Sequence, residues 1–264
     1  MPPDVTIIPS TDDSPAWRAI RERAAARRDS AGLSGPLAAL YGPLLDAAAA
    51  GRHIIAHLGQ SLDGQIALPD GRSSYITGRD DAMHNHRLRA LCDAVIVGAG
   101  TVAADDPRLN VRLVEGDNPV RVVIDPARRL DPGLGVFRDA AAPTLIVCRQ
   151  DAAAGATHHG DAGIIALPAS ADGVLAPADI VDALAARGLT SLFIEGGGAT
   201  VSHFLHAGLV DRLQLTVAPL LLGAGHPVLT LPPIERVDAA PRVAMRPFML
   251  GTDLLYDCVP DVRR

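Results

Sequence analysis

From residue 53 onward, short apolar runs alternate with helical or turn segments, and this alternation constrains the fold more than any other feature. Continuous apolar runs of about four to eight residues are typical of strands that are buried on both faces, as in a parallel sheet covered by its crossover helices. The pattern predicts strands at residues 53–58, 94–98, 120–124, 144–148, 163–166, 191–195 and 211–217. It predicts helices at residues 79–91, 177–187 and 198–207.

The two ends of the chain differ from this pattern. Residues 242–250 and 253–259 predict an antiparallel hairpin around a Gly-Thr turn. Residues 15–28 and 36–50 are rich in Ala or Arg and predict helices. We therefore expect an α/β fold whose mixed, mostly parallel sheet is flanked by helices and ends in a C-terminal antiparallel hairpin. Residues 1–50 form a helical N-terminal extension, which covers the core or a neighbouring subunit or, alternatively, acts as a substrate lid.

The composition excludes several classes of partner. A formal net charge of −6 provides no basic surface for general binding to nucleic acid or to an anionic membrane. No segment has the roughly 18 apolar residues of a membrane span or the apolar core of a signal peptide. Cys92, Cys148 and Cys258 are widely spaced, which argues against a disulfide framework and against a zinc site. We expect a cytoplasmic protein that binds a small molecule and no metal, with 48% apolar residues to supply its core.

A glycine-containing segment follows the second predicted strand. Gly98 and Gly100 let backbone N–H groups approach a phosphate, and Thr101 adds a hydroxyl donor. The segment also fits the G-x-G-x-x-A pattern of a Rossmann dinucleotide site, with Asp125 in the position of the ribose-binding acid. A Rossmann helix continues well past its glycines, whereas Pro107 stops this helix early, because an interior proline costs about 3 kcal/mol. The segment therefore indicates a phosphate-binding loop outside a Rossmann fold.

Glycines also follow the strand predicted at residues 191–195. Gly196, Gly197 and Gly198 place bare backbone N–H groups at the start of a helix, where the helix dipole favours an anion such as pyrophosphate. Glu195, at the carboxyl end of the strand, faces the crevice in which open α/β sheets bind ligands. A plain glycine turn explains either segment alone, but two such segments in one chain favour a dinucleotide site.

Polar residues before and within the first helix of the main domain complete the candidate set. Asp63 lies in an Asp-Gly turn, and its spacing alone favours a carboxylate that bonds its own backbone. Ser73 and Tyr75 belong to a polar and aromatic loop, and His86 and Arg89 share one face of the helix that follows. An arginine on a crevice-facing helix suits bidentate contact with a phosphate, although a solvated arginine is more frequent.

Together these segments resemble the reductase domain of the bifunctional riboflavin-biosynthesis deaminase/reductase. The similarity extends from about residue 54 to residue 256, and the motifs occur in the family's order. They are Ser61-Leu62-Asp63-Gly64, Ser73-x-Tyr75-Ile76-Thr77-Gly78, His86-Arg87-Leu88-Arg89-Ala90, Gly98-Ala99-Gly100-Thr101-Val102, Ala104-Asp105-Asp106-Pro107-Arg108-Leu109, Glu195-Gly196-Gly197, Ala207-Gly208-Leu209-Val210-Asp211, Ala218-Pro219 and Leu221-Leu222-Gly223.

The resemblance implies a dihydrofolate-reductase-like fold for residues 51–264, usually in a dimer. It implies that NADPH delivers a hydride to C1′ of a ribosylaminopyrimidine 5′-phosphate, which yields the ribitylamino product. A homodimer is also expected because residues 213–222 and the terminal hairpin would otherwise leave a long sheet edge uncovered.

Carried over residue by residue, the resemblance assigns two groups of site residues. The cofactor side comprises Gly59, Tyr75, Gly98, Gly100, Thr101, Asp105, Gly196, Gly197, Gly198, Ala199 and Thr200. The substrate side comprises Ser73, Arg89, Leu109, Arg112 and Glu195. Glu195 or Asp63 is expected to hold positive charge near the reacting imine nitrogen, while Arg89 and Arg112 bind the phosphate.

Several positions depart from the family's usual residues. They are His57 and Gln65, where Lys or Arg is common, Arg72, where Glu is frequent, and Pro126, where Ser or Thr is usual. Without a hydroxyl at Pro126, the 2′-phosphate of the cofactor is left to Arg128, Arg129 or Arg149.

The sequence also limits the reaction. It contains neither H-x-E nor P-C-x-x-C, which excludes zinc-dependent deamination. Two alternatives remain open: an NADPH-dependent reductase of another heterocycle, such as a pterin or dihydrofolate, and a non-catalytic nucleotide-binding module.

Overall fold

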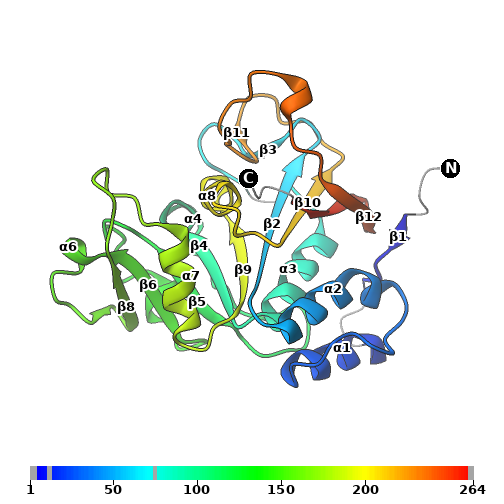
Figure 1. Ribbon diagram of the computed structural model, residues 1–264, viewed down its shortest axis with the longest axis horizontal. Helices are drawn as coiled ribbons and strands as arrows, with labels where there is room; N and C mark the ends of the chain where they lie inside the picture. Colours follow the sequence, from blue (N-terminus) through cyan, green and yellow to red (C-terminus); the bar gives the residue numbers. More distant parts are fainter. Residues whose placement is uncertain (1–4, 11–13, 74–75, 261–264) are drawn as a thin grey trace.

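The computed structural model describes residues 5–10, 14–73 and 76–260, and one large sheet runs through the molecule (Figure 1). In spatial order its strands are β1 (Thr6–Ile7), β12 (Ala244–Leu250), β13 (Asp253–Val259), β10 (Arg212–Ala218), β2 (His53–Ser61), β9 (Ser191–Gly196), β4 (Ala94–Gly98), β5 (Val120–Ile124), β6 (Thr144–Arg149), β8 (Ala162–Leu167) and β7 (His158–His159). The strands from β10 to β8 are all parallel, and β12 and β13 form an antiparallel hairpin against β10. The predicted mixed, mostly parallel sheet with a C-terminal hairpin is confirmed.

Helices cover both faces of this sheet. They are α1 (Pro15–Ala25), α2 (Pro36–Ala50), α3 (Arg79–Leu91), α4 (Ala99–Asp105), α5 (Gly135–Arg138), α6 (Gln150–Ala153), α7 (Pro177–Ala185) and α8 (Gly198–His206), with the short 3₁₀ helix η1 (Val237–Ala239) near the end. A second, two-stranded sheet pairs β3 (Gln65–Ala67) with β11 (His226–Pro227) above the main body (Figure 1).

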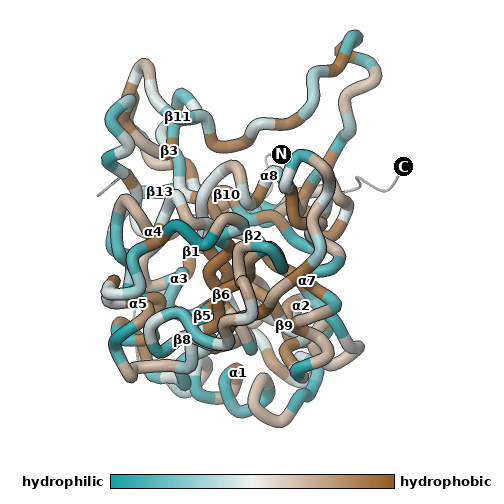
Figure 2. The backbone as a smooth tube through the Cα atoms, turned by 90° about the vertical axis from the view of Figure 1, so that its left-hand side faces the viewer, coloured by the Kyte–Doolittle hydropathy of each residue, from teal (hydrophilic) through white to brown (hydrophobic). Residues whose placement is uncertain are grey.

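Alternate residues along the strands feed two hydrophobic clusters. In β2, Ile55 packs with α1, α2 and α3, whereas Ile54 and Ala56 pack with α7 and α8 on the opposite face. This arrangement follows from the two-residue period of a strand. The most hydrophobic segments accordingly lie in the strands at the centre of the molecule (Figure 2).

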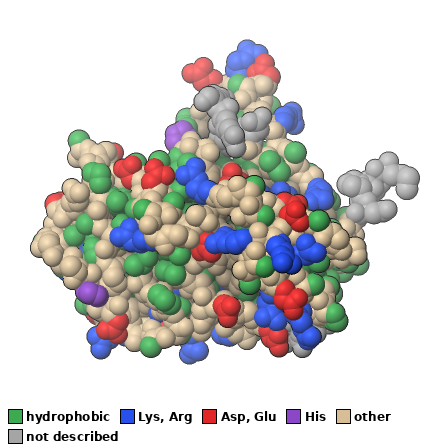
Figure 3. All heavy atoms as spheres, turned by 60° about the horizontal axis from the view of Figure 1, so that its bottom comes forward, with side chains coloured by type: hydrophobic (Ala, Val, Ile, Leu, Met, Phe, Trp, Pro, Cys, Tyr) green, Lys and Arg blue, Asp and Glu red, His purple; other side chains and the backbone are tan. Residues whose placement is uncertain are grey.

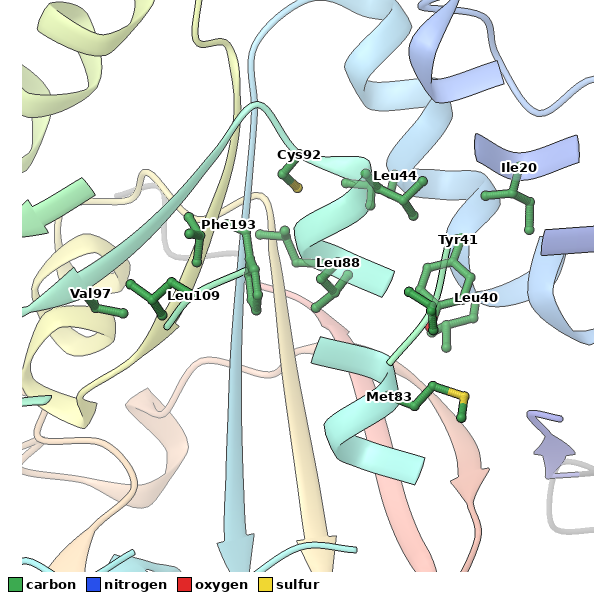
Figure 4. Close-up of a cluster of buried hydrophobic side chains, with 14 of the residues drawn as sticks. Ile20, Leu40, Tyr41, Leu44, Met83, Leu88, Cys92, Val97, Leu109 and Phe193 are labelled. Atoms are coloured by element: carbon green, nitrogen blue, oxygen red, sulfur yellow. The ribbon is translucent and has the colours of Figure 1, made fainter. Parts of the chain in front are cut away.

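The N-terminal helices are part of the larger of these clusters. Ser14 caps α1 by accepting a hydrogen bond from the Trp17 backbone N–H at 3.1 Å, and Pro15 occupies the first turn, where its missing N–H costs nothing. Trp17 is fully buried and its indole N–H donates to the carbonyl of Glu115 at 3.0 Å. Figure 4 shows Leu40 and Leu44 of α2 beside the side chains of α3. We therefore expect removal of this segment to expose the outer face of α3.

Two details of the sheet bear on the sequence predictions. The helix α4 ends at Asp105, two residues before Pro107, and the Asp125 carboxylate accepts the Leu130 N–H at 2.9 Å within a turn. Neither feature belongs to a Rossmann site. The expectation that residues 213–222 lie at a sheet edge is wrong, because β10 pairs with β2 on one side and with β13 on the other. On this side of the sheet the outer long strand is β12, and among the described residues β1 pairs with its Phe248 and Met249.

Candidate active site

A cavity of about 600 Å³ opens at the carboxyl ends of β2, β9 and β4, a size within the range of small-molecule sites. The β3 segment and residues 226–230 enclose it from above, although β3 and β11 are far apart in the sequence. The predicted site residues that border it are Gly59, Ser73, Gly100, Thr101, Asp105, Leu109, Glu195, Gly196, Gly197, Gly198 and Ala199. No described residue of the N-terminal extension does so, which gives the substrate-lid alternative no support.

The two glycine segments meet in the structure. A Cβ on Gly98 would overlap the Thr200 hydroxyl, and a Cβ on Gly197 would lie 3.1 Å from Thr101 Oγ1. Gly197 also has φ of +76°, a conformation that favours glycine, and it stands as the cap residue before α8. Each segment therefore leaves room for the threonine of the other, and Gly197, Gly198 and Ala199 border the cavity at the start of α8.

Glu195 occupies a β-bulge. Opposite β4, Ile96 pairs with Ile194 and Val97 with Gly196, so Glu195 is the extra residue, and the pairing of β9 with β2 has already ended at Ile194. Bulges of this kind re-aim a side chain and are frequent beside active sites. The bulge turns the glutamate toward the cavity.

Arg89 holds Glu195 from behind. Its Nε donates to Oε2 of Glu195 at 2.6 Å and a second nitrogen donates to Oε1, with only 8% and 12% of the two side chains exposed. The remaining guanidinium nitrogen donates to the Asn110 carbonyl at 2.8 Å and contacts His86. All three guanidinium nitrogens of Arg89 therefore have protein partners, and Arg89 does not border the cavity.

Arg112 is more exposed and lies on the same side. Its backbone N–H donates to Nδ1 of His86 at 2.9 Å, and its side chain donates to Asn110 Oδ1. Burial, and then the positive charges of Arg89 and Arg108, lower the pKa of Arg112. The same environment lowers the pKa of His86 to about 3, chiefly through burial, so the imidazole is neutral. Leu109, next to this group, has a positive φ of 52°, a strained conformation of the kind that collects at functional sites.

Asp63 does not border the cavity. Its carboxylate accepts hydrogen bonds from the Ser61 hydroxyl at 2.5 Å and from the backbone N–H groups of Leu222 and Gly223 at 3.1 and 2.7 Å. These bonds lower the pKa of Asp63 to about 2. The arrangement matches the turn interpretation of the sequence and ties the end of β2 to the segment after β10.

The structure adds a buried group that the site predictions missed. Asp81, in the first turn of α3, is 1% exposed and borders the cavity. Its Oδ1 accepts the Thr216 hydroxyl at 2.6 Å and lies 3.0 Å from Nε2 of His57. We call these three residues the Asp81 cluster. Burial opposes ionisation of Asp81, but the charge and hydrogen bond of His57 and the bond from Thr216 outweigh it, and the pKa of this carboxyl lies well below its usual range.

A second buried histidine connects this cluster to the N-terminal helices. His84 lies with its ring centroid 5.1 Å from that of His57. The Tyr41 hydroxyl of α2 is 2.7 Å from its Nδ1, and the Gln214 amide oxygen is 2.8 Å from its Nε2. Burial, followed by the charge of His57, lowers the pKa of His84 to about 3. The N-terminal extension thus supports the site from the far side of α3.

The remaining predicted residues fall outside this cavity. Thr200 borders a small neighbouring cavity with Pro126 and Leu175, and Arg149 borders a hollow of about 510 Å³ at the ends of β6 and β8. Gly98 lies behind the glycine contact, and Tyr75 lies outside the described residues.

Within the described part of the chain, no His, Cys, Asp and Glu side chains group as metal ligands, and no helix is long and apolar enough to cross a membrane. Acidic and basic side chains are interspersed on the face drawn in Figure 3.

Sequence comparison identifies relatives of this chain. The 2,5-diamino-6-ribosylamino-4(3H)-pyrimidinone 5′-phosphate reductase of Methanothermobacter thermautotrophicus is 37% identical over 218 residues, which cover 78% of this chain and 96% of that protein. The riboflavin biosynthesis protein RibD of Mycobacterium tuberculosis is 34% identical over 175 residues, which cover 65% of this chain and 43% of that protein. The chain thus spans nearly all of the first relative and less than half of the second.

Solved structures agree with the fold. The deaminase/5-amino-6-(5-phosphoribosylamino)uracil reductase of Thermotoga maritima superposes with a TM-score of 0.68 at 25% identity, over 84% of this chain and 59% of that one. RibD of Acinetobacter baumannii gives the same TM-score and identity over 84% of this chain and 62% of its own. The sequence pattern of the RibD C-terminal domain family matches residues 52–246, after the end of α2. The resemblance predicted from the motifs is confirmed, and this chain belongs to the RibD C-terminal domain family.

Proposed function

We propose that this protein is an NADPH-dependent reductase that converts a ribosylaminopyrimidine 5′-phosphate to its ribitylamino product. The observation that carries the proposal is the position of Glu195. A β-bulge turns it into the cavity beside two glycine segments, and a buried arginine holds both of its oxygens. The names of the relatives, which are reductases of riboflavin biosynthesis, support the substrate class.

The glycine segments suit a dinucleotide. A Cβ on Gly198 would lie 2.6 Å from the Val228 carbonyl, so glycine lets the segment after β11 pack against the start of α8. Gly197 and Gly198 border the cavity at the amino end of this helix, where the helix dipole favours a pyrophosphate. Thr101 borders the same space and supplies a hydroxyl donor. Arg149, whose only side-chain partner among the described residues is the exposed Asp151, is our candidate for the 2′-phosphate, since Arg128 already donates to the Ala153 carbonyl. NADPH bound there would supply the hydride.

The protein's own part is to orient the substrate and to stabilise charge. When the ribosyl ring opens, positive charge develops at the exocyclic nitrogen attached to C1′. The carboxylate of Glu195, fixed by Arg89 at the edge of the cavity, favours that charge before the reaction begins. We assign this role to Glu195 rather than to Asp63, whose carboxylate already accepts the backbone N–H groups of Leu222 and Gly223. Arg112, in the positive field of Arg89 and Arg108, is the better candidate for binding the 5′-phosphate.

The direct test is NADPH oxidation, followed by absorbance, with a ribosylaminopyrimidine 5′-phosphate and with dihydrofolate in parallel. The proposal expects turnover of the pyrimidine phosphate and little turnover of dihydrofolate, which lacks the ribosyl phosphate. Preference for dihydrofolate would favour a reductase of another heterocycle. Binding of NADPH without turnover of either would favour a non-catalytic nucleotide-binding module.

We also propose that the protein acts in the cytoplasm as a homodimer. Large apolar side chains stay exposed along the segment from β10 to the outer strand β12, and a partner would bury them. They are Leu221, Leu231, Ile234, Val237, Val243 and Met245. Light scattering should return about twice the mass of one chain, and a strictly monomeric chain at micromolar concentration would contradict the proposal.

A further inference from the structure

The substrates in the names of the Methanothermobacter thermautotrophicus and Thermotoga maritima reductases differ at one position of the pyrimidine ring. One reductase acts on a 2,5-diamino-4(3H)-pyrimidinone, whereas the other acts on a 5-aminouracil, in which an oxo group replaces the 2-amino group. We propose that Asp81, held by Thr216 and His57, makes this chain select the 2-amino-4-pyrimidinone and reject the uracil. The inference rests on the proposed function and concerns which pyrimidine enters the same cavity.

The two rings present different hydrogen-bonding edges. In the 2-amino-4(3H)-pyrimidinone, N3–H and the 2-amino group form two parallel donors. In the uracil, the same edge has the N3–H donor beside the oxygen at C2, which is an acceptor. An ionised carboxylate only accepts, so it pairs with both groups of the first edge and opposes the oxygen of the second. A site built to bond a substrate group strongly rejects an analogue that leaves its own polar group unpaired.

Asp81 has one oxygen left for such an edge. Both of its hydrogen-bonding contacts, with Thr216 and His57, reach Oδ1. Among the described residues no hydrogen bond reaches Oδ2. That oxygen lies toward Gly59, where an added Cβ would come within 3.3 Å of it, and Asp81, Gly59 and Thr77 all border the cavity. Oδ2 can therefore meet the 2-amino group while Oδ1 shares N3–H.

The neighbours keep Asp81 an acceptor. The Thr216 hydroxyl donates a hydrogen bond to Oδ1 of the carboxylate, and a protonated acid would accept this bond less well. The His57 imidazole contacts the same oxygen. All three residues are almost fully buried, so the arrangement is fixed before a ligand arrives. Thr216 and His57 are positioning residues in this account.

The position also suits the rest of the substrate. Across the sheet the order is β10 with Thr216, then β2, then β9 with Glu195. Glu195 therefore stands two strand spacings from Thr216, roughly 10 Å across the sheet, and is offset from it along the strands. In a six-membered ring, position 6 is opposite N3. A pyrimidine whose N3 edge meets Asp81 thus directs its 6-ribosylamino group away from Asp81, and Glu195 lies on that side.

The experiment compares kcat/KM for 2,5-diamino-6-ribosylamino-4(3H)-pyrimidinone 5′-phosphate and for 5-amino-6-(5-phosphoribosylamino)uracil. The wild type should prefer the first by about 10- to 150-fold, the value of one charge-assisted hydrogen bond. Asp81→Asn replaces the free oxygen with an amide donor and should lower this ratio by a similar factor. Asp93→Asn is the matched control. Asp93 accepts the backbone N–H groups of Thr190 and Ser191 at the amino ends of the strands, away from the cavity, so the ratio of this variant should equal that of the wild type.

The ratio separates selection from a general loss of activity, since damage to folding or catalysis lowers both values alike. Thr216→Val provides a second variant if Asp81→Asn does not fold, and it should lower the ratio less because the carboxylate remains. A wild type that prefers the uracil, or variants that keep the wild-type ratio, would overturn the selection by Asp81 but leave the proposed function standing. A wild type that reduces neither pyrimidine would overturn the proposed function and this inference with it.

Discussion

Glu195 and Asp81 both border the cavity and both pair with a basic side chain, but their partners hold them in different ways. Arg89 occupies both oxygens of Glu195 from behind, whereas Thr216 and His57 occupy only Oδ1 of Asp81. In the proposed function, Glu195 therefore contributes its charge and its position. Asp81 keeps an oxygen for direct bonding to a ligand, and the two carboxylates are suited to chemistry and to recognition respectively.

The largest effect should come from the carboxylate assigned to chemistry. Glu195→Gln keeps the shape of the side chain but removes the charge that stabilises the developing cation. We expect kcat and kcat/KM to fall together by about 100- to 1000-fold, because the lost interaction is strongest in the transition state. NADPH affinity, measured by fluorescence titration, should survive. A variant that changes KM alone would assign Glu195 to binding and remove the contrast with Asp81.

The second test concerns the arginine behind Glu195. From the sequence we assigned Arg89 to the substrate phosphate, and loss of such a contact would raise KM for the pyrimidine phosphate and leave NADPH affinity nearly intact. Because Arg89 is bound to Glu195, we now expect kcat to fall as well, by about 10- to 150-fold. The double variant Arg89→Ala/Glu195→Gln should be little worse than Glu195→Gln alone, since coupled residues are not additive.

Arg112→Ala is the control for this test. Its side chain is exposed and not bonded to Glu195, so it should raise KM for the phosphorylated substrate and leave kcat nearly unchanged. Additive effects of the Arg89 and Glu195 substitutions would show that the ion pair has no role in catalysis. Thermal unfolding must accompany the kinetics, because breaking one side of a buried ion pair costs about 3–5 kcal/mol.

The same two carboxylates show what a sequence can reveal. Glu195 was predicted because its signals are local: an apolar strand, then glycines, at the carboxyl edge of a parallel sheet. Asp81 was missed because an aspartate in the first turn of a helix is already explained by the helix dipole. Its decisive partner, Thr216, lies 135 positions away. The bulge at Glu195 depends on pairing between strands and leaves no signal in the local sequence.

The fold follows a similar division. The central strands were predicted nearly to their ends, because strands buried on both faces read as unbroken apolar runs. The short pair β3 and β11 was not predicted, since strands of two or three residues carry no period of their own. Residues 213–222 were placed at an edge because the sequence does not state the order of strands, and β13 covers that side.

The third prediction concerns His84, the buried histidine beside His57. His84 has a hydroxyl and an amide as partners and lacks a carboxylate, and burial lowers its pKa from 6.5 to about 3. Between these values the unfolded chain binds more protons, so stability is full above pH 6.5 and is lost as the pH falls toward 3. At pH 5 this histidine alone should reduce the free energy of unfolding by about 2 kcal/mol, roughly a 30-fold change in equilibrium.

Urea unfolding at pH 7.5 and pH 5.0 measures this loss. A His84→Gln variant should be less stable than the wild type at pH 7.5, because it disturbs the bonds to Tyr41 and Gln214, but it should lose about 2 kcal/mol less between the two values. Equal losses in the two proteins would mean that other groups, such as the buried His53, cause the pH dependence.

The smallest effect should come from an ion pair on the surface, which extends the comparison beyond the buried pairs. Arg149 and Asp151 pair at 3.0 Å with 30% and 73% of their side chains exposed, and exposed pairs contribute little. Arg149 is therefore free to leave Asp151 for a 2′-phosphate at little cost. Arg149→Ala should raise KM for NADPH about 10-fold, at the low end for a charge-assisted bond, and leave KM for NADH unchanged. Arg138→Ala is the control, because Arg138 also belongs to an exposed ion pair, with Asp161 before the amino end of β8. The difference between the two cofactors should shrink at high ionic strength, since salt screens exposed charges. An equal rise in KM for NADPH and NADH would place Arg149 beside a part of the dinucleotide that both cofactors share. No rise in either KM would make Arg129 the candidate for binding the 2′-phosphate.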